Sequence, residues 1–167
     1  MASWIADLPD IWTIALWGFA ATVVMTTIMY GSQMAGLSRL SLPFLVGTCL
    51  TADRDRATIL GFIAYLIGGW LFAAIYAALF AALGGASWWI GAVIGLLHGL
   101  FLLAVMLPVL PHFHPRMASE YDGPSDVRRL EPPGFLGLNY GFRTPVTTLL
   151  AQTAYGLTLG VFLPLTT

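Results

Sequence analysis

The chain contains no lysine, since all seven of its basic residues are arginines, and only 9% of its residues are charged. Soluble domains carry about a quarter charged residues, so this composition is not that of a water-soluble fold. The formal net charge of −1 creates no strong positive field, and we expect no nucleic-acid partner. The single cysteine, Cys49, excludes an internal disulfide and any metal site built from several cysteines.

Long apolar runs are abundant, and 58% of the residues are hydrophobic. A helix needs about 20 apolar residues to cross the hydrocarbon core of a bilayer. Four runs satisfy this length, at residues 11–30, 57–83, 88–110 and 145–163. We therefore predict an all-α, polytopic membrane protein, folded as one four-helix bundle and forming a single membrane domain over residues 1–167.

Helix-boundary signals support these spans. Asp10 is a candidate N-cap for the first helix, Ser87 for the third, and Thr144 followed by Pro145 for the fourth. The short link GGAS, residues 84–87, predicts that the second and third spans form an antiparallel hairpin.

The arginines lie in only two segments, residues 31–56 and 111–143. Because cytoplasmic loops carry an excess of arginine and lysine, we expect both segments in the cytoplasm and both termini outside. Residues 40–50 are apolar but too short to span, and we interpret them as a re-entrant or interfacial piece. The stretch PPGFLGLNYG predicts an ordered loop between the third and fourth helices, lying against the membrane surface or a partner.

Small residues follow one face of every span and predict close helix packing. The most regular face is on the third span, at Gly91, Gly95 and Gly99, with a counterpart on the fourth at Gly156 and Gly160. The other two spans offer a similar pattern at Gly18, Thr22, Gly69, Ala73, Ala77 and Ala81. These faces would serve a compact bundle, other membrane subunits or a homo-oligomer.

His98 lies near the middle of the third span, where an ionisable residue is a functional hypothesis by default. Gln152 and Tyr155 lie at a similar depth in the fourth span. A neutral imidazole there could bond Gln152 or Tyr155 as a structural contact, relay a proton or bind a metal, haem or pigment. The spans contain no second histidine for a bis-histidine haem, and no carboxylate of the kind expected in a proton-coupled transporter.

A second histidine motif, HFHP, follows the third span. Pro108, Pro111 and Pro115 are predicted to break the helix there, so that His112 and His114 would alternate along an extended backbone and point the same way. Two imidazoles suit zinc, copper or iron, with a third ligand supplied by Met117, Glu120 or Asp122. The alternative is a pair of amphipathic histidines at the headgroup layer.

Three motifs in order, GFAATVVMTTIMYG, GLLHG and LLAQTAYGLTLG, resemble a family of bacterial four-helix integral membrane proteins that has no known activity. Where that family has a histidine in its last helix, this chain has Gln152. The resemblance implies the four-helix fold and no chemistry. We interpret the chain as a multi-pass protein of the bacterial inner membrane.

The sequence shows no catalytic constellation, and we expect a non-catalytic accessory or assembly subunit of a larger membrane complex, in respiratory or photosynthetic electron transfer. Two alternatives stay open. One is a small transporter or metal-handling protein that uses His98, His112 and His114. The other is a haem- or quinone-binding membrane protein with His98 as the ligand.

Overall fold

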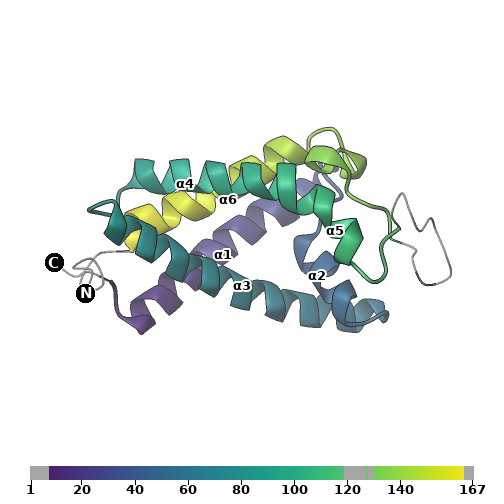
Figure 1. The fold of residues 1–167 in the computed structure, drawn as a ribbon, viewed down its shortest axis with the longest axis horizontal. Helices are drawn as coiled ribbons and strands as arrows, with labels where there is room; N and C mark the ends of the chain where they lie inside the picture. The colour runs from purple at the N-terminus through teal and green to yellow at the C-terminus, as the bar shows by residue number, and fades with distance from the viewer. Residues whose placement is uncertain (1–7, 119–126, 128–129, 164–167) are drawn as a thin grey trace. The chain divides into compact units, whose positions relative to one another are not determined.

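The computed structural model describes residues 8–118, 127 and 130–163, and this part of the chain is helical (Figure 1). The long helices are α1 (Ile11–Met34), α3 (Arg54–Ala82), α4 (Trp88–Phe101) and α6 (Thr144–Phe162). Shorter elements are α2 (Leu42–Leu50), a π-helical turn η2 (Leu102–Met106), α5 (Leu107–Phe113) and a 3-10 segment η3 (Phe135–Tyr140). The predicted all-α class is therefore confirmed.

Among the residues that the structure describes, three helical runs are long and apolar enough to cross a membrane: Ile11–Met34, Arg54–Ala82 and the continuous run Trp88–Phe113. They coincide with the first three predicted spans. α6 forms where the fourth span was predicted, but its five threonines and Gln152 make it less apolar. Most of these polar side chains are buried, at Thr144, Thr147, Thr148, Gln152 and Thr158. The count of four spans stays a prediction.

Asp10 caps α1 as expected, and the glycines after the second span form the predicted turn, whereas the hydroxyl of Thr144 meets Ser38 rather than the first turn of α6. A carboxylate oxygen of Asp10 accepts hydrogen bonds from the backbone N–H of Trp12 at 2.9 Å and of Thr13 at 3.1 Å. These bonds satisfy donors that the first turn of α1 leaves unpaired. At the other end of the second span, α3 stops at Ala82, and Gly84 and Gly85 take φ values of +81° and +157°. The turn therefore uses backbone conformations that favour glycine.

The third span does not break at its prolines. The helix continues through Pro108 and Pro111 to Phe113, contrary to the prediction from the sequence. Pro108 has no N–H to offer the carbonyl four residues earlier. The helix widens just before it into η2, where the N–H of Leu107 donates to the carbonyl of Leu102. This wider turn accommodates the proline without ending the helix.

The chain forms two compact units, which we describe separately. The helix unit comprises Met1–Ile28, Leu66–Gly99 and Leu149–Thr167, and the arginine-rich unit comprises Met29–Tyr65 and Leu100–Thr148. Every arginine that the structure describes belongs to the second unit: Arg39, Arg54, Arg56, Arg116 and Arg143. Among its described residues, the helix unit has Asp10 as its one carboxylate and no arginine. The described arginines therefore all belong to one of the two units.

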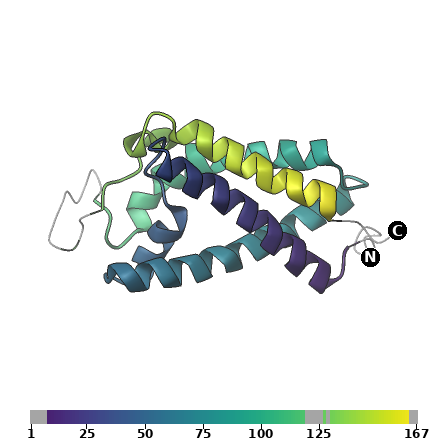
Figure 2. The same ribbon diagram turned by 180° about the vertical axis from the view of Figure 1, so that it is seen from behind.

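Glycine faces join the helices of the helix unit in two pairs. α4 and α6 lie side by side in both views (Figures 1 and 2), and a Cβ added to Gly91 would collide with the carbonyl of Gly156. α1 and α3 pair in the same way, since a Cβ on Gly18 would lie 2.8 Å from the Cβ of Ala73. The small-residue faces predicted from the sequence are therefore used inside the chain.

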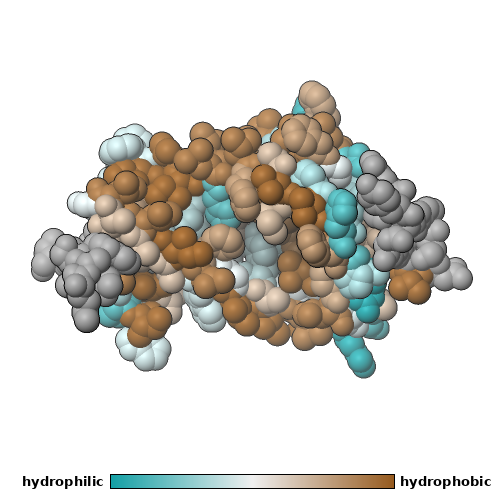
Figure 3. Space-filling model, in the orientation of Figure 1, coloured by the Kyte–Doolittle hydropathy of each residue, from teal (hydrophilic) through white to brown (hydrophobic). Residues whose placement is uncertain are grey.

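The outer surfaces of the helices are apolar, as a lipid environment requires. Brown, hydrophobic residues predominate on the face drawn in Figure 3. In the helix unit, large side chains such as Leu16, Ile67, Leu71, Leu97 and Val161 are at least half exposed.

In the arginine-rich unit, the segment predicted as re-entrant or interfacial forms α2, packed against the first turns of α3. A Cβ on Gly61 would collide with the carbonyl oxygen of Pro43, and one on Gly47 would collide with the carbonyl of Ala57. Two glycines thus let the backbones of the helices touch. In the same unit, α5, η2 and η3 contact one another.

Candidate functional site

His98 lies on α4 and points to α3, where its Nδ1 is 3.3 Å from the hydroxyl of Tyr76. The ring also packs on Phe72, with centroids 4.3 Å apart and planes tilted by 35°. Tyr76 is buried, whereas His98 is only partly buried. The hydrogen-bond partner that the structure gives His98 is therefore Tyr76 of α3, a residue that the sequence analysis did not consider beside Gln152 and Tyr155.

Gln152 and Tyr155 lie in the same unit but serve other contacts. The hydroxyl of Tyr155 donates to the carbonyl of Gly69 at 2.6 Å, and its ring meets Tyr76 edge-on at 5.5 Å. Gln152 lies against Gly99 of α4. Its side-chain oxygen is buried and has no hydrogen-bond partner among the described residues.

The histidines of the HFHP motif are not a pair. His112 lies in the last turn of α5 and is exposed, whereas His114 follows the helix and is buried. The expected alternation along an extended backbone is wrong, because the helix continues through Pro111. Glu120 and Asp122, which were considered as further ligands, lie outside the described residues. Within the described part of the chain, no group of three His, Cys, Asp or Glu side chains could hold a metal ion.

His114 instead joins α2 to the segment after α5. Its Nε2 lies 3.1 Å from the carbonyl oxygen of Leu45, and its Nδ1 accepts from the backbone N–H of Arg116 at 3.1 Å. The guanidinium of Arg116 donates to the carbonyls of Thr48 and Cys49, at the end of α2. Both ring nitrogens are therefore engaged, and the ring is the neutral form protonated on Nε2.

Acid is expected to weaken this junction. Burial lowers the pKa of His114, and the neighbouring Arg116 lowers it further, although the hydrogen bond to Leu45 opposes the shift. In the unfolded chain the imidazole takes up a proton near pH 6.5. The stabilisation of the folded state by neutral His114 is complete above that pH. It is lost as the pH falls through the lower pKa that His114 has in the folded state.

We expect the Tm of the detergent-solubilised protein to be lower at pH 5.5 than at pH 7.5, because at pH 5.5 the folded state binds fewer protons at His114 than the unfolded chain does. His114→Gln should lower Tm at pH 7.5 and reduce its dependence on pH. The control His112→Gln, at an exposed position, should keep the full dependence. A His114→Gln variant with an unchanged pH dependence would show that another group is responsible.

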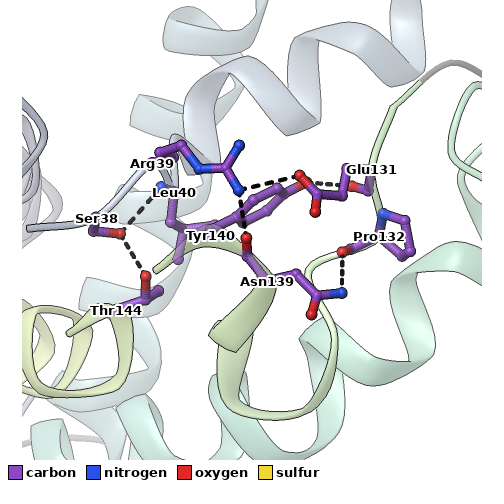
Figure 4. A network of polar contacts seen from close by, with 8 residues as sticks. All are labelled: Ser38, Arg39, Leu40, Glu131, Pro132, Asn139, Tyr140 and Thr144. Carbon is purple, nitrogen blue, oxygen red and sulfur yellow. Dashed lines mark hydrogen bonds and ion pairs between the residues drawn. The ribbon is translucent and has the colours of Figure 1, made fainter. Parts of the chain in front are cut away.

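A network of polar contacts holds η3 and its flanking residues against the segment after α1 (Figure 4). The guanidinium of Arg39 donates to the carbonyl of Asn139 at 2.5 Å and to the Glu131 carboxylate at 3.3 Å. The backbone N–H of Arg39 donates to the carbonyl of Tyr140 at 2.7 Å, and the hydroxyls of Ser38 and Thr144 lie 2.8 Å apart. We call this set the loop clamp.

Tyr140 is the buried centre of the clamp. Its hydroxyl donates to the backbone carbonyl of Glu131 at 2.5 Å. Burial raises the pKa of Tyr140 to about 12, and the Glu131 carboxylate contributes to the rise, so the phenol stays protonated and keeps its donor. The ion pair between Arg39 and Glu131 is more than half exposed on the arginine side, and such pairs contribute little by themselves. The hydrogen bonds to backbone groups of Glu131, Asn139 and Tyr140 therefore contribute more to the order of the loop than the ion pair does.

The clamped loop holds a strained backbone and exposes apolar side chains. Leu136 has φ +55°, in the left-handed region that costs a non-glycine residue about 1–2 kcal/mol. Phe135 is 63% exposed, Leu138 44% and Phe142 88%. The ordered loop predicted between the third and fourth helices is therefore present from Leu130 onward, and it exposes apolar groups as well as the charged Glu131 and Arg143.

The one thiol is not set up as a nucleophile. Cys49 is partly buried on α2, and burial raises the pKa of its thiol despite the nearby Arg116. A raised pKa keeps the thiol protonated at neutral pH, and the thiol is less reactive than the thiolate.

Comparison of the chain with models of protein families, with curated proteins and with solved structures gave no match. The evidence for function is therefore the geometry itself.

Three residues of the site were not anticipated from the sequence. Tyr76 and Phe72 stand in an uninterrupted apolar run, where aromatic side chains are ordinary packing residues. Arg116 was read only as a charge on the cytoplasmic side. One signal could have pointed to Tyr76. The GGAS hairpin implies that the second and third spans lie side by side, and this would bring a residue of the second span next to His98.

Proposed function

We propose that this chain is a non-catalytic accessory subunit that docks on a larger complex in the bacterial inner membrane. The clamped loop carries the proposal: residues 130–143 are fixed by the loop clamp and hold apolar side chains outward. A loop that merely joins two helices has no need of a strained, hydrogen-bonded backbone. Ordering costs about 1–2 kcal/mol for each residue, and an interface that needs a preformed surface benefits from it.

The exposed side chains of the loop have the chemistry of an interface core. Phe135 and Phe142 are large, exposed aromatic groups, which interfaces favour. Arg39 of the loop clamp is also exposed, and arginine is another residue type that interfaces favour. The arginine-rich unit fits the cytoplasmic side by the positive-inside pattern. We therefore assign the docking surface to the cytoplasmic side. We propose a topology in which both termini lie outside the cytoplasm.

The rest of the described chain supports a binding role rather than catalysis. His114 and Arg116 are engaged in holding α2, and the glycine faces are used between α4 and α6. We propose an electron-transfer complex as the partner class, a choice that co-purifying haem or flavin absorbance would test.

A double variant tests the docking surface. Phe135→Ser with Phe142→Ser removes two exposed aromatic groups and should leave the fold intact. We expect it to lose its co-purifying subunits after extraction in a mild detergent, with little change in Tm. The control Leu71→Ser with Leu97→Ser changes two exposed apolar residues of the helix unit and should retain the partners. Loss of partners in the control alone, or retention of partners in the loop variant, would overturn the assignment.

A further inference from the structure

The Nε2 atom of His98 has no hydrogen-bond partner among the described residues. Its Nδ1 faces the hydroxyl of Tyr76, and neither residue has another hydrogen-bond partner among the described residues. Tyr76 is 2% exposed, and a buried phenol needs an acceptor for its proton. Among the described residues the hydroxyl of Tyr76 meets Nδ1 of His98, so Tyr76 donates and the neutral imidazole carries its own proton on Nε2.

This assignment determines what His98 can bind. An Nε2–H group donates a hydrogen bond and has no lone pair for a metal, so this tautomer does not suit axial ligation of a haem or a metallated pigment. It suits a carbonyl oxygen. His98 is ten residues from the nearer end of the run Trp88–Phe113, about 15 Å at 1.5 Å per residue. Lipid ester carbonyls lie at the edge of a hydrocarbon core about 30 Å thick, far from this depth.

The face of α3 that carries Phe72 has open space one turn earlier in the helix. Phe72 packs on His98 and is 38% exposed. One turn earlier on the same face of α3 lies Gly68, where an added Cβ would meet no heavy atom within 4 Å. The adjacent Gly69, in contrast, packs against Thr22 of α1. A glycine inside a helix costs about 1 kcal/mol relative to alanine, and packing within the chain does not account for Gly68.

A partner helix would fit this surface less well than a small molecule. Close helix contacts need a stripe of small residues, and α4 already uses Gly91 and Gly95 against α6. On α3, the neighbours of Gly68 and Phe72 are large and exposed, at Ile67, Leu71 and Ile75. These large side chains would keep the backbone of a partner helix away from α3, while the space beside Gly68 stays open.

We propose that His98, Phe72 and Gly68 form a membrane-facing site for a lipophilic ring compound that carries a carbonyl oxygen, the quinone class. The Nε2–H of His98 donates to the carbonyl, Phe72 packs on the ring, and Gly68 leaves space for its edge. Tyr76 is a positioning residue, because it fixes the tautomer without touching the ligand. The site belongs to the helix unit and is independent of the docking loop, so either proposal can fail alone.

Binding of decylubiquinone to the full chain in nanodiscs tests the site. Gly68→Leu fills the gap at a position without internal contacts, so it should fold normally and bind at least about tenfold more weakly. His98→Leu removes the donor and should weaken binding by about tenfold. The matched control is Gly31→Leu, at another helical glycine whose Cβ would meet nothing within 4 Å; it should bind as the wild type does.

Nitrogen-15 NMR of the labelled histidine gives a second readout. We expect the wild-type signal of His98 to be that of the Nε2–H tautomer, and the signal of Tyr76→Phe to show both tautomers. Equal affinity of the wild type, Gly68→Leu and His98→Leu would overturn the proposal. An Nδ1–H tautomer in the wild type would also overturn it, since Nε2 would then be an acceptor.

Discussion

Leucine at Gly95 should abolish folding of the helix unit. A Cβ at this position would lie 2.9 Å from the Cα of Thr153 and closer still to the carbonyl of Gln152. These are backbone atoms of α6, which cannot turn aside as a side chain can. Ordinary overpacking costs about 1–3 kcal/mol, and separating two helices along their whole contact costs more, so we expect a loss above about 4 kcal/mol.

The measurement is the yield of monodisperse protein in detergent and its Tm. Gly68→Leu and Gly31→Leu are the matched controls, because they make the same substitution at helical glycines that face open space. Both should keep the yield of the wild type and a Tm within a few degrees of it. A Gly95→Leu protein that is as stable as these controls would mean that α4 and α6 do not pack through this face.

Leucine at Gly61 is expected to detach α2 from α3 and so to disrupt the arginine-rich unit. Here the added Cβ would lie 2.9 Å from the backbone nitrogen of Gly47 and would overlap the carbonyl oxygen of Pro43. The collision is again with backbone, but α2 has only nine residues and can move away as a whole. The expected result is local opening of α2 with retention of the helix unit.

Cys49 reports this opening, because it lies on α2 and its thiol is partly buried with a raised pKa. In Gly61→Leu, the rate of reaction with a maleimide should rise by about tenfold or more, as expected when a protected group becomes available through local opening. Gly31→Leu is the control in the same unit and should leave the rate unchanged. An unchanged rate in Gly61→Leu would contradict the close packing of α2 on α3.

The spans could be predicted from the sequence because they depend on local properties. Runs of about 20 apolar residues, the cap at Asp10 and the glycines after Ala82 each act through neighbouring residues, and the helices begin and end close to the predicted positions. The glycine faces were also visible, since small residues four apart have no other common purpose in a lipid-facing helix.

The site was harder to predict because it depends on which helix lies beside which. His98 was expected to meet α6, where Gln152 and Tyr155 lie at the same depth. Gly95 and Gly99 turn that side of α4 to α6, and His98 therefore points to α3, where Tyr76 looked like ordinary packing. The prediction for the HFHP motif was wrong for a local reason. The π-helical turn η2 carries the helix past Pro108, so His112 stays in the helix and is exposed, whereas His114 follows the helix and is buried.

The docking loop could be anticipated only in part. Its turn residues and aromatic groups indicated order, but the clamp joins Arg39 to Asn139 and Glu131 across about a hundred positions. No short pattern marks such a contact.

The most direct test of the proposed function is the mass of the native particle, measured by mass spectrometry after gentle extraction of the wild-type protein. One chain has a mass of 18.0 kDa. If the protein is an accessory subunit, the particle contains this chain in a fixed ratio with other membrane subunits, and its mass is no multiple of 18.0 kDa. A particle that contains only this chain, alone or in copies, would contradict the proposal.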